Sequence, residues 1–365
     1  MPLTCGLVGL PNAGKSTLFR AITAAQAEIA PYAFTTITPN VGVVRVPDPR
    51  LEAIAEITHP KRVVPATLEL VDIAGLVRNA HKGEGLGNQF LGRIREVDAL
   101  LHVVRCFRGD VGHVEVGVDP LRDIGIVETE LLLADLATVE RARAEAIPRA
   151  RTGDRAARQA DAALSQLEAH LAAGRAAKIV SRPAGDESMA RAAGPLRLLT
   201  GRPVLYVANL DEGEVANSPC LDAISRHAAD AGAVALGLCA KLELELADLP
   251  EAEAAEFLAA VGLNERGLPR LIRACESLLD LCTFFSIASS EVRAWHVPAG
   301  TRAPAAAGRI HTDMERGFIR AEVVAYRDLS ALGSVAAARE RGMVRLEGRD
   351  YEIQDGDIVT FRFAV

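Results

Sequence analysis

Residues 9–17 read GLPNAGKST, the most informative motif in the chain. Gly9 is followed by four residues and then by Gly14, Lys15 and Ser16, between a short apolar run and a helical pattern. Glycines let a backbone wrap closely around phosphate groups, with N–H groups and a helix N-terminus directed at the anion. The motif therefore predicts a nucleotide cradle in which Lys15 reaches the β- and γ-phosphates and the Ser16 hydroxyl binds Mg²⁺. The other predicted cradle residues are Asn12, Ala13 and Thr17.

Further apolar runs predict strands that alternate with helical stretches: 66–73, 97–107, 203–208 and 233–238. Hydrophobic residues make up 49% of the chain and aromatic residues only 4%, so the core must be built mainly from Ala, Val, Leu and Ile. That composition suits helices and parallel strands better than an all-β fold. We therefore expect an α/β protein with a doubly wound, mostly parallel sheet.

Length, charge and cysteine content narrow the class of protein. A chain of 365 residues has room for two or three domains, and its formal charge of -7 argues against bulk electrostatic coating by nucleic acid. The scattered cysteines form no C-x-x-C pair, so we expect small buried hydrophobes in a reducing compartment. No signal peptide or membrane span is expected, because apolar runs stay short of about 18 residues. These features predict a cytoplasmic, multidomain protein without a membrane partner.

Two composition changes predict the domain organisation. Residues 128–195 are rich in Ala, Arg and Glu, and two leucine runs at helical spacing flank Pro148 and Gly153. This pattern predicts two antiparallel helices in an inserted arm, or else extra helices on the same core. From residue 280 onward, short strands around a helix predict a separate domain. The predicted division is a nucleotide domain of 1–127 and 196–279, an α-helical arm of 128–195, and a C-terminal domain of 280–365.

Two further segments complete the predicted phosphate and metal site. Asp72 ends the strand in VDIAGL (71–76) and can hold Mg²⁺, while Gly75 can offer its N–H to a γ-phosphate. Thr36, in YAFTTITPNVG (32–42), is predicted to bind Mg²⁺ and the γ-phosphate. Many GTPases carry a water-orienting glutamine after this glycine, but this chain has Leu76. Either the leucine simply packs, or another residue positions the water.

The stretch YVANLDE (206–212) nearly spells the Asn-Lys-x-Asp with which many GTPases bind guanine. Leu210 replaces the lysine, and Glu212, one methylene longer than aspartate, crowds the guanine position. Asn209 can still bond the edge of an adenine, and Leu210 can flank the base as a lysine stem does. Asp211 leaves weak guanine binding open. We therefore predict a preference for ATP.

Long strings resemble the YchF, or Obg-like ATPase, family from end to end: GLPNAGKSTLF, FTTITPNVGVV, VDIAGLV, HKGEGLGNQFL, HVVRCF, YVAN, and the C-terminal EVRAW, AAGRIHTD, GFIRAEV and GRDYEIQDGDIV. The resemblance implies a Ras-like P-loop domain interrupted by the helical arm and followed by a β-grasp TGS domain. It also implies slow ATP hydrolysis with Mg²⁺, aided by K⁺ near Asn12. Cys239 and Ala240, in GLCAK (237–241), match the loop beside the base.

The family resemblance extends to partners and to a catalytic histidine. Family members associate with ribosomes and are linked to translation and stress, so the expected partners are ATP or ADP and the ribosome or a subunit, with rRNA contacts through the TGS domain and the arm. The chain is expected to be a monomer. His113 matches the histidine proposed to replace the missing glutamine; it lies in a glycine-bearing loop, and imidazole titrates near neutrality. His81 is the rival, and His102 is expected in the core.

Three functions follow from these patterns. The first is an ATPase switch that docks on ribosomal particles. The second is a GTPase of the Obg type. The third is a nucleotide-gated module for ribosome or RNA binding, in which hydrolysis is incidental.

Overall fold

The computed structural model describes residues 3–27, 41–73, 86–109, 117–179, 187–215, 217–288 and 290–364. Four predicted site residues lie outside the described residues: Thr36, Gly75, His81 and His113. The chain forms two compact units. The P-loop unit comprises Thr4–Gly42 and Leu70–Leu271, and the C-terminal unit comprises Met1–Leu3, Val43–Glu69 and Ile272–Val365.

A six-stranded sheet with the order β2-β4-β1-β5-β6-β7 carries the P-loop. Parallel pairing joins β1 to β5, β5 to β6 and β6 to β7, so the α/β prediction is confirmed. All seven residues of β5 are buried, as expected for the centre of a sheet covered on both faces. The strands are β1 (Leu3–Val8), β2 (Val41–Val46), β4 (Ala66–Asp72), β5 (Ala99–Arg105), β6 (Val204–Asn209) and β7 (Val234–Leu238).

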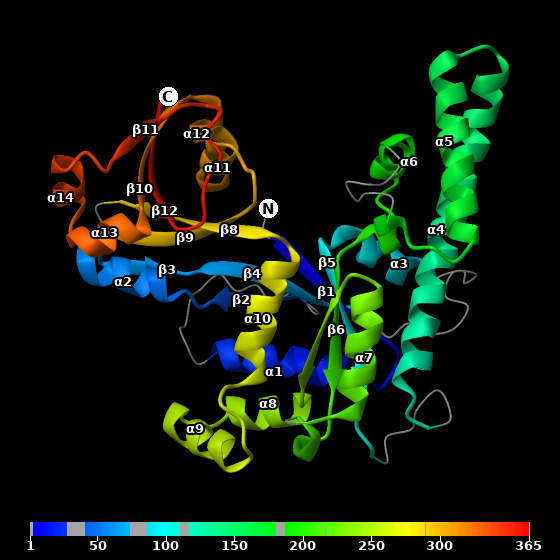
Figure 1. The fold of residues 1–365 in the computed structure, drawn as a ribbon, viewed down its shortest axis with the longest axis horizontal. Helices are drawn as coiled ribbons and strands as arrows, with labels where there is room; N and C mark the ends of the chain where they lie inside the picture. Colours follow the sequence, from blue (N-terminus) through cyan, green and yellow to red (C-terminus); the bar gives the residue numbers. More distant parts are fainter. Residues whose placement is uncertain are drawn as a thin grey trace. The chain divides into compact units, whose positions relative to one another are not determined.

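Helices flank these strands, and several begin directly after a strand that contributes to the site (Figure 1). Helix α1 follows the glycine-rich loop and packs against α8. The helices of this part of the chain are α1 (Lys15–Ala27), α3 (Leu86–Glu96), α7 (Pro219–Asp230), α8 (Ala240–Ala247), α9 (Glu251–Ala260) and α10 (Gly267–Leu278).

The inserted segment forms a long helical hairpin of α4 (Pro120–Arg151) and α5 (Arg155–Ala172), which lie side by side in Figure 1. The predicted antiparallel helices are therefore present, but Pro148 lies inside α4, and the break falls at Gly153 with φ 97°. Asp154 then caps α5 by accepting two backbone N–H bonds. Shorter elements complete the insert: η2 (Ala177–Ile179), α6 (Glu187–Ala193), η3 (Gly194–Leu196) and η4 (Leu199–Gly201).

The root of α4 belongs to the core of the P-loop unit. Val127 and Leu131 pack in one apolar cluster with strand residues such as Leu100, and Ile124 packs in another with Tyr206. Helix α4 thus begins before the predicted boundary at residue 128, because its first turns bury an apolar face against the sheet.

The C-terminal unit contains a second sheet, ordered β11-β10-β12-β8-β9-β3. Its main core cluster is built around Phe284, Val323 and Val359. The elements are β8 (Leu281–Ile287), β9 (Glu291–Pro298), α11 (Ala303–Ile310), α12 (Thr312–Arg316), β10 (Phe318–Ala325), α13 (Tyr326–Leu332), α14 (Val335–Glu340), β11 (Arg345–Glu347) and β12 (Asp357–Phe363).

Residues 43–69 fold with the C-terminal unit, although the sequence division placed them in the nucleotide domain. Strand β3 (Arg62–Val64) pairs in parallel with β9, and α2 (Pro49–Thr58) packs on α13. The Arg50 guanidinium donates to the Asp355 carboxylate at 2.6 Å. This pairing joins segments far apart in sequence, which a reading of local patterns does not reveal.

Within the described ranges, the structure has no helix with the length and apolar character needed to cross a membrane.

Candidate nucleotide-binding site

The glycine-rich loop after β1 runs so close to neighbouring strands that two positions admit only glycine. Gly9 has φ 148°, and a Cβ there would lie 2.3 Å from the Val103 carbonyl oxygen in β5. Gly14 has φ 94°, and a Cβ there would lie 2.0 Å from Asn209 Nδ2. Both backbone conformations are costly for other residues. The glycines therefore let the loop approach the sheet as well as a phosphate.

Lys15, the first residue of α1, turns back onto the loop. Its Nζ donates to the carbonyl oxygens of Gly9 at 3.1 Å and Leu10 at 2.8 Å. Burial lowers the pKa of Lys15 to about 8, with the Asp72 carboxylate acting in the opposite direction. A cation held at the mouth of a loop of backbone N–H groups is suited to phosphate oxygens.

The two predicted Mg²⁺ ligands Ser16 and Asp72 are hydrogen-bonded to each other. The Ser16 hydroxyl donates to Asp72 Oδ2 at 3.1 Å, which joins the start of α1 to the end of β4. Hydroxyl and carboxylate oxygens are ligands that Mg²⁺ accepts, together with phosphate oxygens and water. In the described part of the chain no group of three or more His, Cys, Asp or Glu side chains could hold a metal by itself. The oxygens of Ser16 and Asp72 are of the type that fits Mg²⁺.

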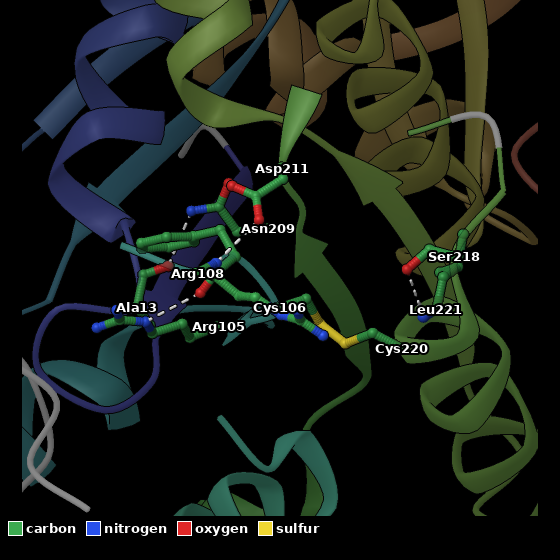
Figure 2. The surroundings of a disulfide bond; sticks show 10 residues. Ala13, Arg105, Cys106, Arg108, Asn209, Asp211, Ser218, Cys220 and Leu221 are labelled. Atoms are coloured by element: carbon green, nitrogen blue, oxygen red, sulfur yellow. Dashed lines mark hydrogen bonds between the residues drawn. A yellow bond between two sulfur atoms is a disulfide. The ribbon is translucent and has the colours of Figure 1, made fainter. Parts of the chain in front are cut away.

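Asn209, the last residue of β6, bridges two loops (Figure 2). Its Nδ2 donates to the Ala13 carbonyl oxygen at 3.0 Å, and its Oδ1 accepts from the Ala240 N–H at 3.0 Å. The side chain is 4% exposed. An amide has two N–H donors and two oxygen lone pairs, so this bridge leaves capacity for a further ligand. Asn209 thus fastens the phosphate loop to the start of α8.

The three residues after Asn209 differ in burial and in contacts. Leu210 is 1% exposed and packs in a core cluster with Tyr206 and Ile224, while its N–H donates to the Leu238 carbonyl oxygen at 2.8 Å. Burial against α7 therefore holds this apolar side chain in place, and its role beside a base stays a prediction. Asp211 Oδ2 accepts from the Arg108 N–H at 2.9 Å, and exposed Glu212 begins η5 (Glu212–Glu214).

Cys239 and Ala240 form the N-terminus of α8. The Cys239 sulfur accepts from the Leu242 N–H at 3.5 Å, and burial raises the pKa of this thiol. Both side chains are buried, at 5% and 1% exposure. The bond from the Ala240 N–H to Asn209 Oδ1 holds this helix start beside Asn209, and the contact of Cys239 and Ala240 with a base stays a prediction.

The segment after β5 belongs to this site, although sequence reasoning did not select it. Arg105 is 3% exposed, donates to the carbonyl oxygens of Phe107 at 3.4 Å and Gly109 at 3.2 Å, and lies 4.5 Å from the centre of the Phe107 ring. The Phe107 ring lies next to Gly14. The signal available in the sequence was the string HVVRCF.

A disulfide links Cys106 to Cys220, with 6.1 Å between the Cα atoms (Figure 2). The expectation that all cysteines are separate buried thiols is therefore wrong for this pair. The other four match it, because they are buried and form no disulfide: Cys5, Cys239, Cys275 and Cys282. A separation of 114 residues hides such a pair from any spacing rule.

His102 lies in the core, as predicted. It is 4% exposed in the middle of β5, its ring lies 5.5 Å from that of Tyr206, and burial lowers its pKa to about 4. The Tyr206 hydroxyl donates to Glu128 at the root of α4, and His227 lies 3.2 Å from the same carboxylate oxygen. This cluster joins the helical hairpin to the sheet.

The parallel sheet, the glycine-rich loop and the group of Lys15, Ser16 and Asp72 define a P-loop nucleotide-binding protein. Residues 4–129 match the family model described as "50S ribosome-binding GTPase", and residues 281–364 match the YchF GTPase C-terminal model, described as "Protein of unknown function (DUF933)".

Two relatives named "Ribosome-binding ATPase YchF" align over 100% of both chains. The one from Haemophilus influenzae is 50% identical over 366 residues, and the one from Bacillus subtilis is 48% identical over 369 residues. The solved structure of the Schizosaccharomyces pombe YchF GTPase is 34% identical, has a TM-score of 0.87, and aligns over 99% of this chain and 97% of that one. The chain belongs to the YchF family.

Proposed function

We propose that the protein is a ribosome-binding ATPase switch that hydrolyses ATP slowly to ADP. The relatives are named ATPases, whereas the fission yeast structure is named a GTPase, so the base preference must rest on the residues. The observation that carries it is the segment 209–212. Leu210 is buried, Glu212 replaces the guanine-binding aspartate, and Asp211 already accepts the Arg108 N–H at 2.9 Å. These features support a preference for adenine over guanine.

The site residues then have separate roles in phosphate binding. Lys15, with a pKa of about 8, is mostly protonated at neutral pH and would exchange its bonds to loop carbonyls for phosphate oxygens. Ser16 and Asp72 would hold Mg²⁺, with Thr36 as a third proposed ligand. The bound ion would neutralise charge on the phosphates. Asn12 is exposed in the loop and is the proposed K⁺ ligand, because carbonyl-type oxygens coordinate K⁺.

Base preference is tested by titrating ATP and GTP against the purified protein with Mg²⁺. We expect tighter binding of ATP, and tighter binding of GTP would overturn the assignment in favour of an Obg-type GTPase. Asp211→Asn is the matched variant. If Asp211 recognises guanine, the variant loses GTP affinity; if it only accepts the Arg108 N–H, the ratio of the two affinities stays unchanged.

We further propose that His113 positions the attacking water and that Gly75 donates to the γ-phosphate. His113→Ala should lower turnover and leave ATP affinity nearly unchanged, because a residue that acts on the water contributes little to ground-state binding. His81→Ala is the matched control and should retain turnover. Equal turnover in His113→Ala and the parent would remove His113, and a loss confined to His81→Ala would transfer the role to that residue.

The proposed partner is the ribosome or one of its subunits. The protein would bind it as a cytoplasmic monomer, through the helical arm (128–195) and the TGS domain (280–365). Arg316 and Arg320 are exposed in the C-terminal unit. Their replacement by alanine should weaken co-sedimentation with ribosomal subunits and reduce its salt dependence. Co-sedimentation under ATP, ADP and no nucleotide tests the switch. A hydrolysis-deficient variant that still binds ribosomes in every state would favour the nucleotide-gated binding module.

A further inference from the structure

Cys106 holds both ends of the segment that follows Asn209 (Figure 2). Its N–H donates to the Asn209 carbonyl oxygen at 2.9 Å, which continues the pairing of β5 with β6. Its sulfur is bonded to Cys220 in the first turn of α7. The two ends of the segment 209–220 are therefore both attached to Cys106, one by a hydrogen bond and the other by a disulfide.

This segment carries the proposed base-recognising residues, and much of it faces solvent. Glu212, Gly213 and Asn217 are exposed. Asp211 is fastened by the Arg108 N–H, two residues beyond Cys106. The disulfide and the Asp211 bond thus tie the segment to the same stretch of chain, 106–108, which also places Phe107 beside Gly14.

We propose that Cys106–Cys220 is a redox-modification site that sets the affinity of the base-recognising segment for its nucleotide. The inference rests on the proposed function of this segment. In the disulfide form the segment is preorganised, so binding a base orders fewer groups. Reduction frees the α7 end and adds that ordering cost to binding. Because the hydrogen bond from Cys106 to Asn209 belongs to the sheet, reduction leaves the phosphate loop and its Asn209 bridge in place.

A dithiol is the co-reactant when the disulfide is reduced, and a small disulfide is the co-reactant when it forms. Cys220 is half-buried, whereas Cys106 is 5% exposed, so an incoming thiolate attacks the Cys220 sulfur. The sulfur–sulfur bond breaks, Cys106 leaves as a thiolate and takes up a proton, and a mixed disulfide remains on Cys220. The second thiol of the reagent then releases Cys220 as a thiol. Two electrons pass from the dithiol, which becomes a cyclic disulfide, to the cysteine pair.

The experiment compares the full-length protein before and after treatment with dithiothreitol. Peptide mapping without reductant should first show the Cys106 and Cys220 peptides joined. We expect reduction to raise the Kd for ATP roughly 3- to 10-fold, which is the scale of ordering a few side chains. The Kd for inorganic tripolyphosphate, which has no base, should stay unchanged because the phosphate loop is not released.

Two variants make the test specific. Cys220→Ser should have the weaker ATP affinity at once and should not respond to dithiothreitol. Cys275→Ala removes a buried cysteine outside the disulfide and should respond as the parent does. Two free thiols in the unreduced protein, or an unchanged ATP affinity on reduction of a joined pair, would overturn the inference. Absence of ATP binding in both redox states would instead contradict the proposed function, which separates the two failures.

Discussion

Replacing Asn209 by alanine tests whether this residue is mainly a bridge or mainly a base contact. Its amide makes two hydrogen bonds of 3.0 Å, one to the Ala13 carbonyl oxygen and one from the Ala240 N–H. Ala13 is 2% exposed and Ala240 is 1% exposed. The substitution leaves one buried carbonyl and one buried N–H without a partner. Since each such group costs about 1–3 kcal/mol, the free energy of unfolding should fall by roughly 2–4 kcal/mol without any nucleotide.

Gly14 supplies a second measurement on the same bridge. A Cβ at Gly14 would lie 2.0 Å from Asn209 Nδ2, so Gly14→Ala should be destabilising for two reasons, the clash and the φ of 94°. Asn209→Ala removes the clash and leaves the backbone cost. The double variant should therefore be more stable than the sum of the single effects indicates, by about 1 kcal/mol or more.

The assay is urea unfolding of the nucleotide-free protein, followed by far-ultraviolet circular dichroism, with the single tryptophan, Trp295, as a separate probe of the C-terminal unit. ATP affinity is measured in parallel. The bridge would be refuted if Asn209→Ala lost ATP affinity but kept the parent's unfolding midpoint, because that outcome assigns the amide to the base alone. Strict additivity of Gly14→Ala and Asn209→Ala would refute the predicted close approach.

Three further predictions concern charge and domain organisation. ATP affinity should fall as pH rises through about 8, where Lys15 loses its proton, and Lys15→Arg should show a flatter dependence of Kd on pH. The pKa of His102 is lowered to about 4 in the folded protein, whereas the unfolded chain binds a proton on this histidine below about pH 6.5. The free energy of unfolding should therefore fall by up to about 3 kcal/mol as the pH drops from about 6.5 to about 4. His102→Phe should lose this pH dependence, as measured by urea midpoints at about pH 7 and about pH 5. A chain that ends at residue 279 lacks β8 and β9, whose side chains pack against Leu51 and Ile54 of α2. These two side chains become exposed, so the truncated chain should bind a hydrophobic dye several-fold more strongly. Unchanged dye binding would favour the domain boundary predicted from sequence.

Local patterns were sufficient wherever the residues of a feature are neighbours in the chain. The spacing of Gly14, Lys15 and Ser16 predicted the loop and the start of α1. The helical hairpin followed from leucine periodicity, although its break at Gly153 and its start at Pro120 depended on packing and caps.

Predictions failed where the outcome depends on distant neighbours. The cysteines were expected to be separate thiols, but the fold brings Cys106 and Cys220, 114 residues apart, into a disulfide. The string HVVRCF was visible, but nothing local indicated that Arg105 would fold over Phe107 beside the phosphate loop.

The phosphate loop, the α/β class and the family could be predicted from the sequence alone, because contiguous residues and strand–helix alternation encode them. Three other features became visible in the folded chain: the bridge that Asn209 makes between two loops, the Cys106–Cys220 disulfide, and the folding of residues 43–69 with the C-terminal unit. All three have the same cause. Buried hydrogen bonds, disulfides and strand pairs depend on which remote segments come together, and that choice is made by the packing of the whole unit.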